Sequence, residues 1–147
     1  DVSMPGISGI EVQEELRKRK STLPIIFVTG HGDIPMAVNA MHRGAFDFIQ
    51  KPYHDEELLE RITLAFAVGR EQSASAIADK EIARRMNTLT PRELEVMGYI
   101  VDGTANKVIA MDLGLSQRTV EVHRSRVMEK MQAHSLAALV RMSISAE

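Results

Sequence analysis

The sequence predicts a chain in two parts: a partial, doubly wound α/β half, followed by an all-α half that contains a helix-turn-helix. Over residues 1–66, amphipathic stretches alternate with short apolar runs rich in β-branched residues, as in a doubly wound parallel sheet. Over residues 88–147, short amphipathic stretches follow one another between N-cap residues and glycines, which indicates short packed helices. Residues 67–87 are then the predicted linker.

In the first half, residues 8–20 are predicted to form an amphipathic helix with Ile10, Val12 and Leu16 facing inward. The apolar run over 24–29 predicts a strand that is buried on both faces, as in parallel sheets. The elements that follow are a helix over 35–43, ended by Gly44, and a strand over 45–49.

Polar side chains stand at the carboxyl ends of the predicted strands. These are Asp1, Thr29 and Lys51. In doubly wound sheets the functional loops gather at this edge, so a carboxylate, a hydroxyl and an ammonium are expected to converge there. A carboxylate can take up a phosphoryl group covalently, while the other two groups neutralise and hydrogen-bond the phosphoryl oxygens.

The predicted linker follows an amphipathic stretch that begins with acidic residues at position 55. The apolar stripe expected to face inward there is Leu58, Leu59, Ile62 and Phe66. Two interpretations stay open: one long connecting helix, or a helix that breaks near Gly69. A long, mostly helical linker with a soft point is the one we favour.

In the second half, Thr90, Pro91 and Glu93 have the spacing of a capping box at a helix start. This helix is predicted to end at Asp102 and Gly103. A second helix is predicted over 105–113, with Val108, Ile109 and Leu113 facing inward. After a tight turn at Gly114, a third helix capped by Ser116 runs to Met131 and packs with Val120, Val127 and Met131.

The other side of the third predicted helix is polar. It carries Arg118, Glu121, Val122, Arg124, Ser125 and Arg126. A partly basic face of short side chains near a helix start suits the major groove and its phosphates. Charge alone would favour a solvated helix face, and it is the caps, the turn and the helix lengths together that favour DNA binding.

Composition excludes several other classes. The chain has 147 residues, no cysteine and a net charge of −2, so disulfides and thiolate metal sites are impossible and bulk charge favours no partner. Without a long apolar run, neither a membrane span nor a secretory signal is expected, and a cytoplasmic protein is the default. Because the chain begins with Asp1 rather than Met, we expect a fragment that lacks its N-terminal part.

The second half resembles the LuxR-type helix-turn-helix family. The matching residues are Leu89-Thr90-x-Arg92-Glu93, Gly103-x-x-Asn106-Lys107-x-Ile109-Ala110, Leu115-Ser116-x-x-Thr119-Val120-x-x-His123-Arg124 and Lys130-Met131. The resemblance implies a four-helix domain whose third helix enters the major groove and whose fourth helix often dimerises. It places Glu121, Val122 and Ser125 near base edges. It places Lys107, Thr119, His123 and Arg126 near phosphates. Glu121 departs from the family, which often has a basic residue there.

The first half resembles the C-terminal part of a response-regulator receiver domain (CheY-like), of the FixJ/NarL type. The matching residues are Asp1-x-x-Met4-Pro5-x-x-x-Gly9, Val28-Thr29-Gly30-His31-Gly32-Asp33, and Phe46-x-Phe48 followed by Lys51-Pro52. The resemblance implies that Asp1 is the phosphoacceptor, with Thr29, Gly30, Phe48 and Lys51 as the phosphoryl-binding and switch residues. It also implies a cis peptide bond before Pro52.

The resemblance further implies Mg²⁺ in the intact receiver, held here only by Asp1 and, weakly, by the backbone carbonyl of Ser3. Because one carboxylate and one carbonyl make an incomplete octahedral site, we expect no bound Mg²⁺ and poor phosphorylation of this chain alone. Two strands rarely stand without a larger sheet, so we also expect residues 1–53 to be under-packed.

The sequence as a whole therefore predicts a two-component response regulator that binds DNA and regulates transcription, switched by phosphorylation of a receiver aspartate. The partners implied are double-stranded promoter DNA, a sensor histidine kinase, RNA polymerase and a second copy in an active homodimer, with no membrane and no enzyme activity. The alternative is a helix-turn-helix used for protein interaction or dimerisation, beside a receiver remnant without function.

Overall fold

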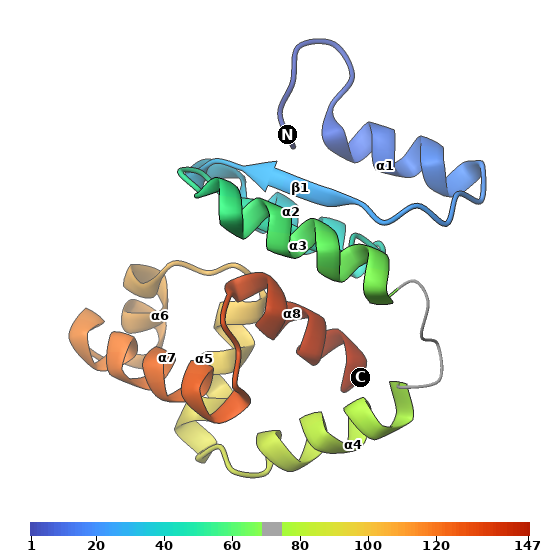
Figure 1. Ribbon diagram of the computed structural model, residues 1–147. Helices are drawn as coiled ribbons and strands as arrows, with labels where there is room; N and C mark the ends of the chain where they lie inside the picture. Colours follow the sequence, from blue (N-terminus) through green and yellow to red (C-terminus); the bar gives the residue numbers. More distant parts are fainter. Residues whose placement is uncertain (69–74) are drawn as a thin grey trace. The chain divides into compact units, whose positions relative to one another are not determined.

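The computed structural model describes residues 1–68 and 75–147 (Figure 1). The chain divides into two compact units, Asp1–Ser73 and Ala74–Glu147. The first unit contains α1 (Gly9–Lys18), β1 (Ile26–Thr29), the 3₁₀ turn η1 (His31–Asp33), α2 (Ile34–His42), β2 (Asp47–Gln50) and α3 (Asp55–Val68). The second contains α4 (Ser75–Met86), α5 (Pro91–Val101), α6 (Asn106–Leu113), α7 (Gln117–Met131) and α8 (Leu136–Ser145).

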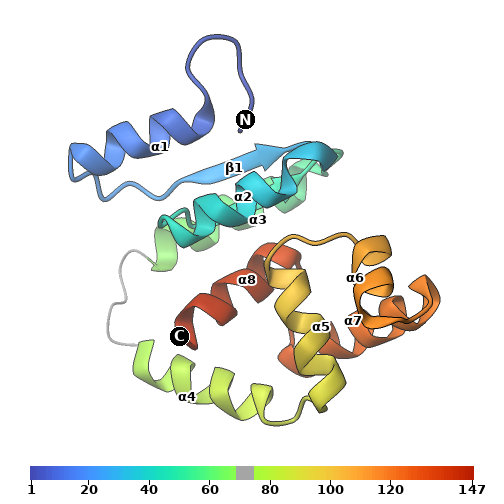
Figure 2. The ribbon, with the colours of Figure 1, turned by 180° about the vertical axis from the view of Figure 1, so that it is seen from behind.

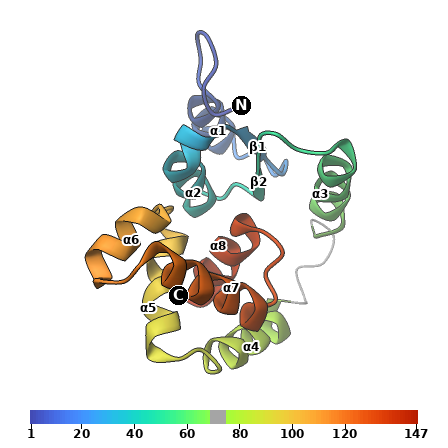
Figure 3. The same cartoon turned by 90° about the vertical axis from the view of Figure 1, so that its left-hand side faces the viewer.

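The first unit has the predicted α/β order. Strands β1 and β2 pair in parallel, with Ile26 opposite Asp47 and Thr29 opposite Gln50. Figure 3 shows α2 on one side of this pair and α3 on the other. The register brings the carboxyl ends of the two strands together, which is the edge at which the sequence predicts the polar cluster.

The helical faces predicted for the first unit are partly wrong. In α1, Val12 is 41% exposed, whereas Gln13 is buried and its side-chain amide donates a hydrogen bond of 2.9 Å to the Ala40 carbonyl. In α3, Leu59 is 63% and Phe66 65% exposed, while Ala65 is buried. The reason is the width of the sheet. Two strands about 4.8 Å apart are narrower than a helix about 10 Å wide, so the sheet cannot cover the whole apolar face of each helix and part of that face stays exposed to solvent. The under-packing predicted for residues 1–53 stays a prediction, and of these exposed apolar residues only Val12 lies within that range.

The second unit has a continuous apolar core. Its members include Val96, Met97, Ile100, Ile109, Val120, Val127, Met131 and Leu139. The inward residues predicted for the third helix of the motif are confirmed, because Val120, Val127 and Met131 are fully buried. Val108 was expected to face inward and is 46% exposed, since its neighbour Ile109 fills the position against the core.

Helix α4 packs on this second core. Its residues Ile82 and Met86 lie partly buried against the core of the helix-turn-helix. The helix packs against α7 and α8, and Figure 2 shows it running beside α8. The break predicted near Gly69 lies outside the described residues, and the boundaries 1–66, 67–87 and 88–147 stay a prediction. The fold class, an α/β half followed by an all-α half, is confirmed.

Candidate nucleic-acid interface and phosphoacceptor cluster

The polar cluster of the first unit forms at the carboxyl edge of the sheet. The Lys51 Nζ lies 2.9 Å from Asp1 Oδ1, and both side chains are about half exposed. The backbone N–H of Lys51 donates a 2.8 Å hydrogen bond to the Thr29 carbonyl, which joins the ends of the two strands. Asp1, Thr29 and Lys51, predicted from positions far apart in the sequence, are therefore neighbours.

Thr29 and Phe48 are more enclosed than the two charged residues. The Thr29 side chain is 1% exposed, and its hydroxyl donates a 3.2 Å hydrogen bond to the Gly30 carbonyl. Phe48 is 4% exposed, within the core of the unit. The peptide bond between Lys51 and Pro52 is cis, as the resemblance implied. In this arrangement the hydroxyl is bonded to backbone and would have to turn to meet a ligand.

Close backbone packing holds the Asp1 segment at this edge. The Gly9 N–H donates to the Val2 carbonyl at 2.9 Å. A Cβ at Gly9 would overlap the Asp1 carbonyl oxygen and lie 2.9 Å from Phe27 Cε1, so this position requires glycine. The Ser3 hydroxyl lies 3.4 Å from both Asp33 carboxylate oxygens. The segment is thus tied to the core and to the turn after β1.

The residues around Asp1 fall short of a magnesium site. Mg²⁺ requires about six oxygens in near-octahedral geometry. Here the Asp1 carboxylate is paired with Lys51, and within residues 1–68 and 75–147 no group of three or more His, Asp or Glu side chains could hold a metal ion. The residues present do not fit the ion by themselves.

In the second unit, the turn before α7 sets the direction of that helix. Gly114 ends α6 with φ 66° and ψ 33°, a left-handed conformation that favours glycine. The Ser116 hydroxyl then accepts a 3.1 Å hydrogen bond from the Thr119 N–H and caps α7. With Val120, Val127 and Met131 buried on one side, the opposite side of α7 is fixed as the outer face.

The outer face of α7 forms a shallow depression. It is lined by Arg118, Glu121, Val122, Ser125, Arg126 and Glu129. Five of these were predicted to face DNA, and the structure brings them together on one face. Two arginines and two glutamates balance in charge, so any attraction to phosphates depends on where each group lies. Lys107 is exposed on the neighbouring α6.

Three other predicted DNA-facing residues are partly enclosed. Thr119 shares a 2.9 Å hydrogen bond with the Ser116 hydroxyl. The Nδ1 atom of His123 is buried and has no hydrogen-bond partner among the residues that the structure describes. Arg124 donates a 3.2 Å hydrogen bond to the Asn106 side chain on α6, and burial lowers the pKa of its guanidinium. Arg124 therefore braces α7 against α6.

Sequence reasoning missed two features of this unit. Glu129 lies on the outer face, and its spacing of four residues from Ser125 and eight from Glu121 was the signal that could have found it. Glu93 was predicted only as a cap. Its carboxylate does accept from the Thr90 N–H, at 3.0 Å, but also lies 2.7 Å from Lys130 Nζ near the end of α7. No local sequence pattern predicts the pairing of Glu93 with Lys130, because the two residues lie far apart in the sequence.

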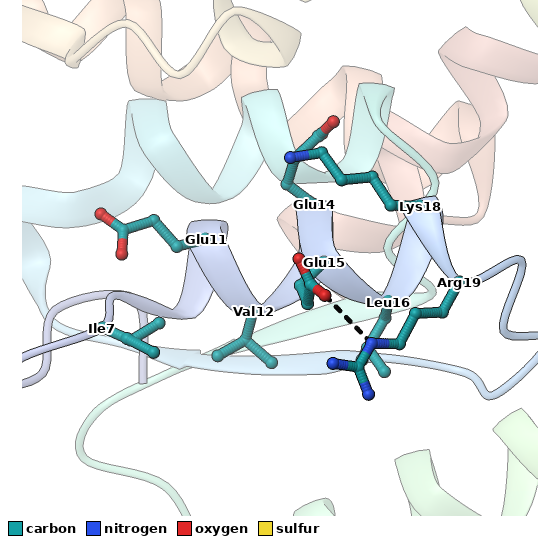
Figure 4. A pocket seen from close by; sticks show the side chains of 8 residues that line it. All are labelled: Ile7, Glu11, Val12, Glu14, Glu15, Leu16, Lys18 and Arg19. Atoms are coloured by element: carbon teal, nitrogen blue, oxygen red, sulfur yellow. Dashed lines mark hydrogen bonds and ion pairs between the residues drawn. The ribbon is translucent and has the colours of Figure 1, made fainter.

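Another hollow, of about 640 Å³, runs along α1. Figure 4 shows Ile7 and Val12 pointing to the same side of this helix, beside the 3.0 Å ion pair of Glu15 with Arg19. None of the predicted site residues lines it. Elsewhere, none of the helices in the described parts of the chain combines the length and apolar character needed to cross a membrane.

Comparison with known proteins matches both units. Residues 1–63 match the response regulator receiver domain, and residues 87–143 match the luxR family of bacterial regulatory proteins. The chain is 47% identical over 146 residues to the transcriptional regulatory protein FixJ of Azorhizobium caulinodans, covering 99% of this chain and 69% of that protein.

Two further relatives have similar identity. The tetrathionate response regulatory protein TtrR of Salmonella typhimurium is 47% identical over 141 residues, covering 96% of this chain and 66% of that protein. The crystal structure of full-length FixJ from B. japonicum is 44% identical, with a TM-score of 0.47 over 99% of this chain and 72% of that one.

Proposed function

This chain belongs to the two-component response regulators that join a receiver domain to a LuxR-type DNA-binding domain, and we propose that it reads promoter DNA with the outer face of α7. It is a transcription regulator of that family, whose partners are DNA and a histidine kinase. The observation that carries the proposal is the orientation of α7: one side is fully buried, and the other presents a largely polar face. A helix so mounted fits the major groove, which is about 12 Å wide.

On this proposal the residues of the outer face divide by role. Glu121, Val122 and Ser125 approach base edges, where a carboxylate can accept from cytosine N4 and a methyl group can meet thymine. The residues that meet phosphates are Lys107, Arg118, Thr119, His123 and Arg126. Arg124 acts through Asn106, holding α7 at its angle to α6.

In the receiver unit, we assign Asp1 as the phosphoacceptor. An oxygen of its carboxylate attacks phosphorus in the phosphohistidine of the kinase, the phosphorus–nitrogen bond breaks, and an acyl phosphate remains on Asp1. Lys51, already 2.9 Å from this carboxylate, neutralises the phosphoryl oxygens. Thr29 turns its hydroxyl from Gly30 to the phosphoryl group, and Phe48 follows the movement as the switch aromatic.

Receiver domains generally bind Mg²⁺ for this transfer. Because the residues around Asp1 do not complete a magnesium site by themselves, we expect this chain alone to be phosphorylated poorly. We further propose that the active regulator is a cytoplasmic homodimer that contacts RNA polymerase and has no enzyme activity of its own.

A second candidate function has one observation in its favour. The outer face of α7 is balanced in charge, two arginines against two glutamates, which also suits a helix-turn-helix that binds protein. The two candidates differ in their response to salt, because DNA binding releases counterions and weakens steeply as salt rises.

The test is selection of duplexes from a random pool by the full chain, followed by affinity measurements against salt. We expect an enriched site, a falling affinity with salt, and at least a severalfold loss in Arg126→Ala. Arg92→Ala is the matched control, because Arg92 is also exposed but lies on α5, where it pairs with Glu95. Absence of enrichment together with a flat salt response would contradict DNA reading and favour the protein-binding candidate.

A further inference from the structure

The C-terminal end of α7 is attached to the rest of the second unit by two cations. The Arg85 guanidinium of α4 donates a 3.1 Å hydrogen bond to the Met131 carbonyl, in the last turn of α7. Lys130, in the same turn, lies 2.7 Å from Glu93 at the start of α5 and 3.1 Å from the Thr88 carbonyl. Both cations suit the negative end of the helix dipole.

These hydrogen bonds restrict the tilt and roll of α7, which the contacts with the apolar core do not determine. Contacts of Val120, Val127 and Met131 with the core are non-directional and allow a helix to tilt or roll. A hydrogen bond to a carbonyl is directional and fixes both position and angle. Since α7 has 15 residues, it is about 22 Å long, and a tilt of about 10° at its C-terminal turn moves its first residues by about 4 Å.

Such a displacement matters for reading bases. Base contacts at the start of α7 need donor and acceptor within about 3 Å, whereas phosphate contacts by flexible arginine side chains tolerate larger shifts. A loss of anchoring at the far end of α7 would therefore reduce discrimination between sequences more than it reduces total affinity.

Arg85 is well placed for this role. Its side chain is 20% exposed, and Glu81, one turn earlier on α4, holds its Nε at 3.2 Å. On either side of it, Ile82 and Met86 lie against the core. The guanidinium is thereby oriented by α4 before it reaches the Met131 carbonyl.

We propose that Arg85 is a positioning residue for DNA recognition: through the Met131 carbonyl, helix α4 sets the angle at which the outer face of α7 meets the bases. This inference rests on the proposed function of α7 and adds a residue outside the helix-turn-helix to its specificity. It also makes α4, the first helix of the second unit, a point at which a displacement changes sequence discrimination.

Neighbouring Arg84 provides a matched control. It is 69% exposed, and its two hydrogen bonds go to Glu81, at 2.9 and 2.7 Å. Arg84→Ala removes one positive charge from the same turn of α4 and leaves the bond to Met131. Arg85→Lys keeps the charge and a donor that can reach a single carbonyl.

The experiment measures the affinity of the 147-residue chain and of each variant for the selected duplex and for a scrambled one. We expect Arg85→Ala to lower the ratio of the two affinities by about five- to tenfold, with the scrambled affinity within about twofold of wild type. Arg84→Ala should keep the wild-type ratio, and Arg85→Lys should recover most of it. Amide hydrogen exchange at residues 129–132 should accelerate in Arg85→Ala alone.

The outcomes separate this inference from the proposed function. A wild-type chain that binds no duplex overturns both. A wild-type chain that discriminates, with an unchanged ratio in Arg85→Ala, overturns the positioning role alone. An equal loss of both affinities in Arg85→Ala, accompanied by a fall in Tm, also overturns it, because the residue would then serve only stability.

Discussion

Glu121 is one of two acidic side chains on the outer face, and their charge opposes DNA. We predict that Glu121→Gln raises affinity for a scrambled duplex severalfold, because repulsion of the phosphates disappears. The same change should erase a preference for cytosine at one position of the selected site. A carboxylate can only accept a hydrogen bond, as from cytosine N4, whereas a glutamine amide both donates and accepts and so can pair with other bases. Affinity for duplexes with every base at each position measures both effects.

Glu129→Gln is the control for this prediction. Glu129 lines the same depression, two turns further along α7, so its loss should raise affinity without changing the preferred bases. If both variants shift the preferred sequence, or neither does, then Glu121 is not a base-reading residue.

Glu93 gives the second unit a defined response to acid. The Lys130 ammonium and, next, the Thr90 N–H hold the pKa of this buried carboxyl below its usual 4.5. A carboxyl whose pKa is lowered on folding adds stability above its unfolded pKa, and this is lost as pH falls through the lowered folded pKa. Glu93→Gln should cost about 1–2 kcal/mol at neutral pH.

The measurement is urea unfolding of wild type and Glu93→Gln at several pH values. Their difference in unfolding free energy should be constant above about pH 5 and shrink as the pH falls below about 4.5. Glu95→Gln removes an exposed ion pair with Arg92 and should change stability little at any pH. A difference that stays constant down to acid pH would contradict this account.

At this scale, local chemistry was predictable and distant partners were not. The capping box of Thr90 and Glu93 has both of its hydrogen bonds, because its residues are three positions apart. The bonds of Glu93 to Lys130 and of Arg124 to Asn106 depend on how helices cross. From the sequence, Arg124 was therefore predicted to face DNA. In the structure it donates a hydrogen bond to Asn106 and joins α7 to α6.

Two glycines in the second unit play opposite roles in their helices. Gly114 ends α6 with φ 66°, and a Cβ there would meet no atom within 4 Å, so only backbone strain opposes a side chain. Gly98 lies inside α5, also with open space around a Cβ. We predict that Gly114→Ala destabilises the unit by about 1 kcal/mol, whereas Gly98→Ala stabilises it by about 0.5–1 kcal/mol.

Thermal or urea unfolding of the two variants tests this pair, and only the sign of each effect is needed. Because both substitutions add one methyl group in open space, a difference of sign must come from the backbone. Stabilisation in Gly114→Ala would mean that the turn before α7 is not held in the left-handed conformation.

Helix and strand positions followed from periodicity and caps, but the covered side of a helix did not. Periodicity shows which residues share a face, and for α7 the neighbouring helices cover that face completely. For α3 the same reasoning placed Leu59 and Phe66 inward, and they are more than half exposed. Whether a helix face is buried depends on how many other elements pack against it. The periodicity of apolar residues carries no information about that number.

The two units differ in how well they bury their apolar residues, and this difference should govern the stability of the whole molecule. The second unit has a core contributed by all of its helices, with Val120, Val127 and Leu139 fully buried. In the first unit, a sheet of two strands is described, and apolar side chains such as Leu23, Leu59 and Phe66 are 63–69% exposed. Such a small sheet stands poorly by itself.

We therefore predict two separate unfolding transitions in urea, with the first unit opening at the lower concentration. Amide hydrogen exchange should be faster in β1 and β2 than in α5 and α7, because local opening follows burial. Leu139→Ala should lower the second transition by about 2–5 kcal/mol and leave the first in place. A single transition that moves as a whole in Leu139→Ala would mean instead that the units unfold together, and that the first unit draws its stability from the second.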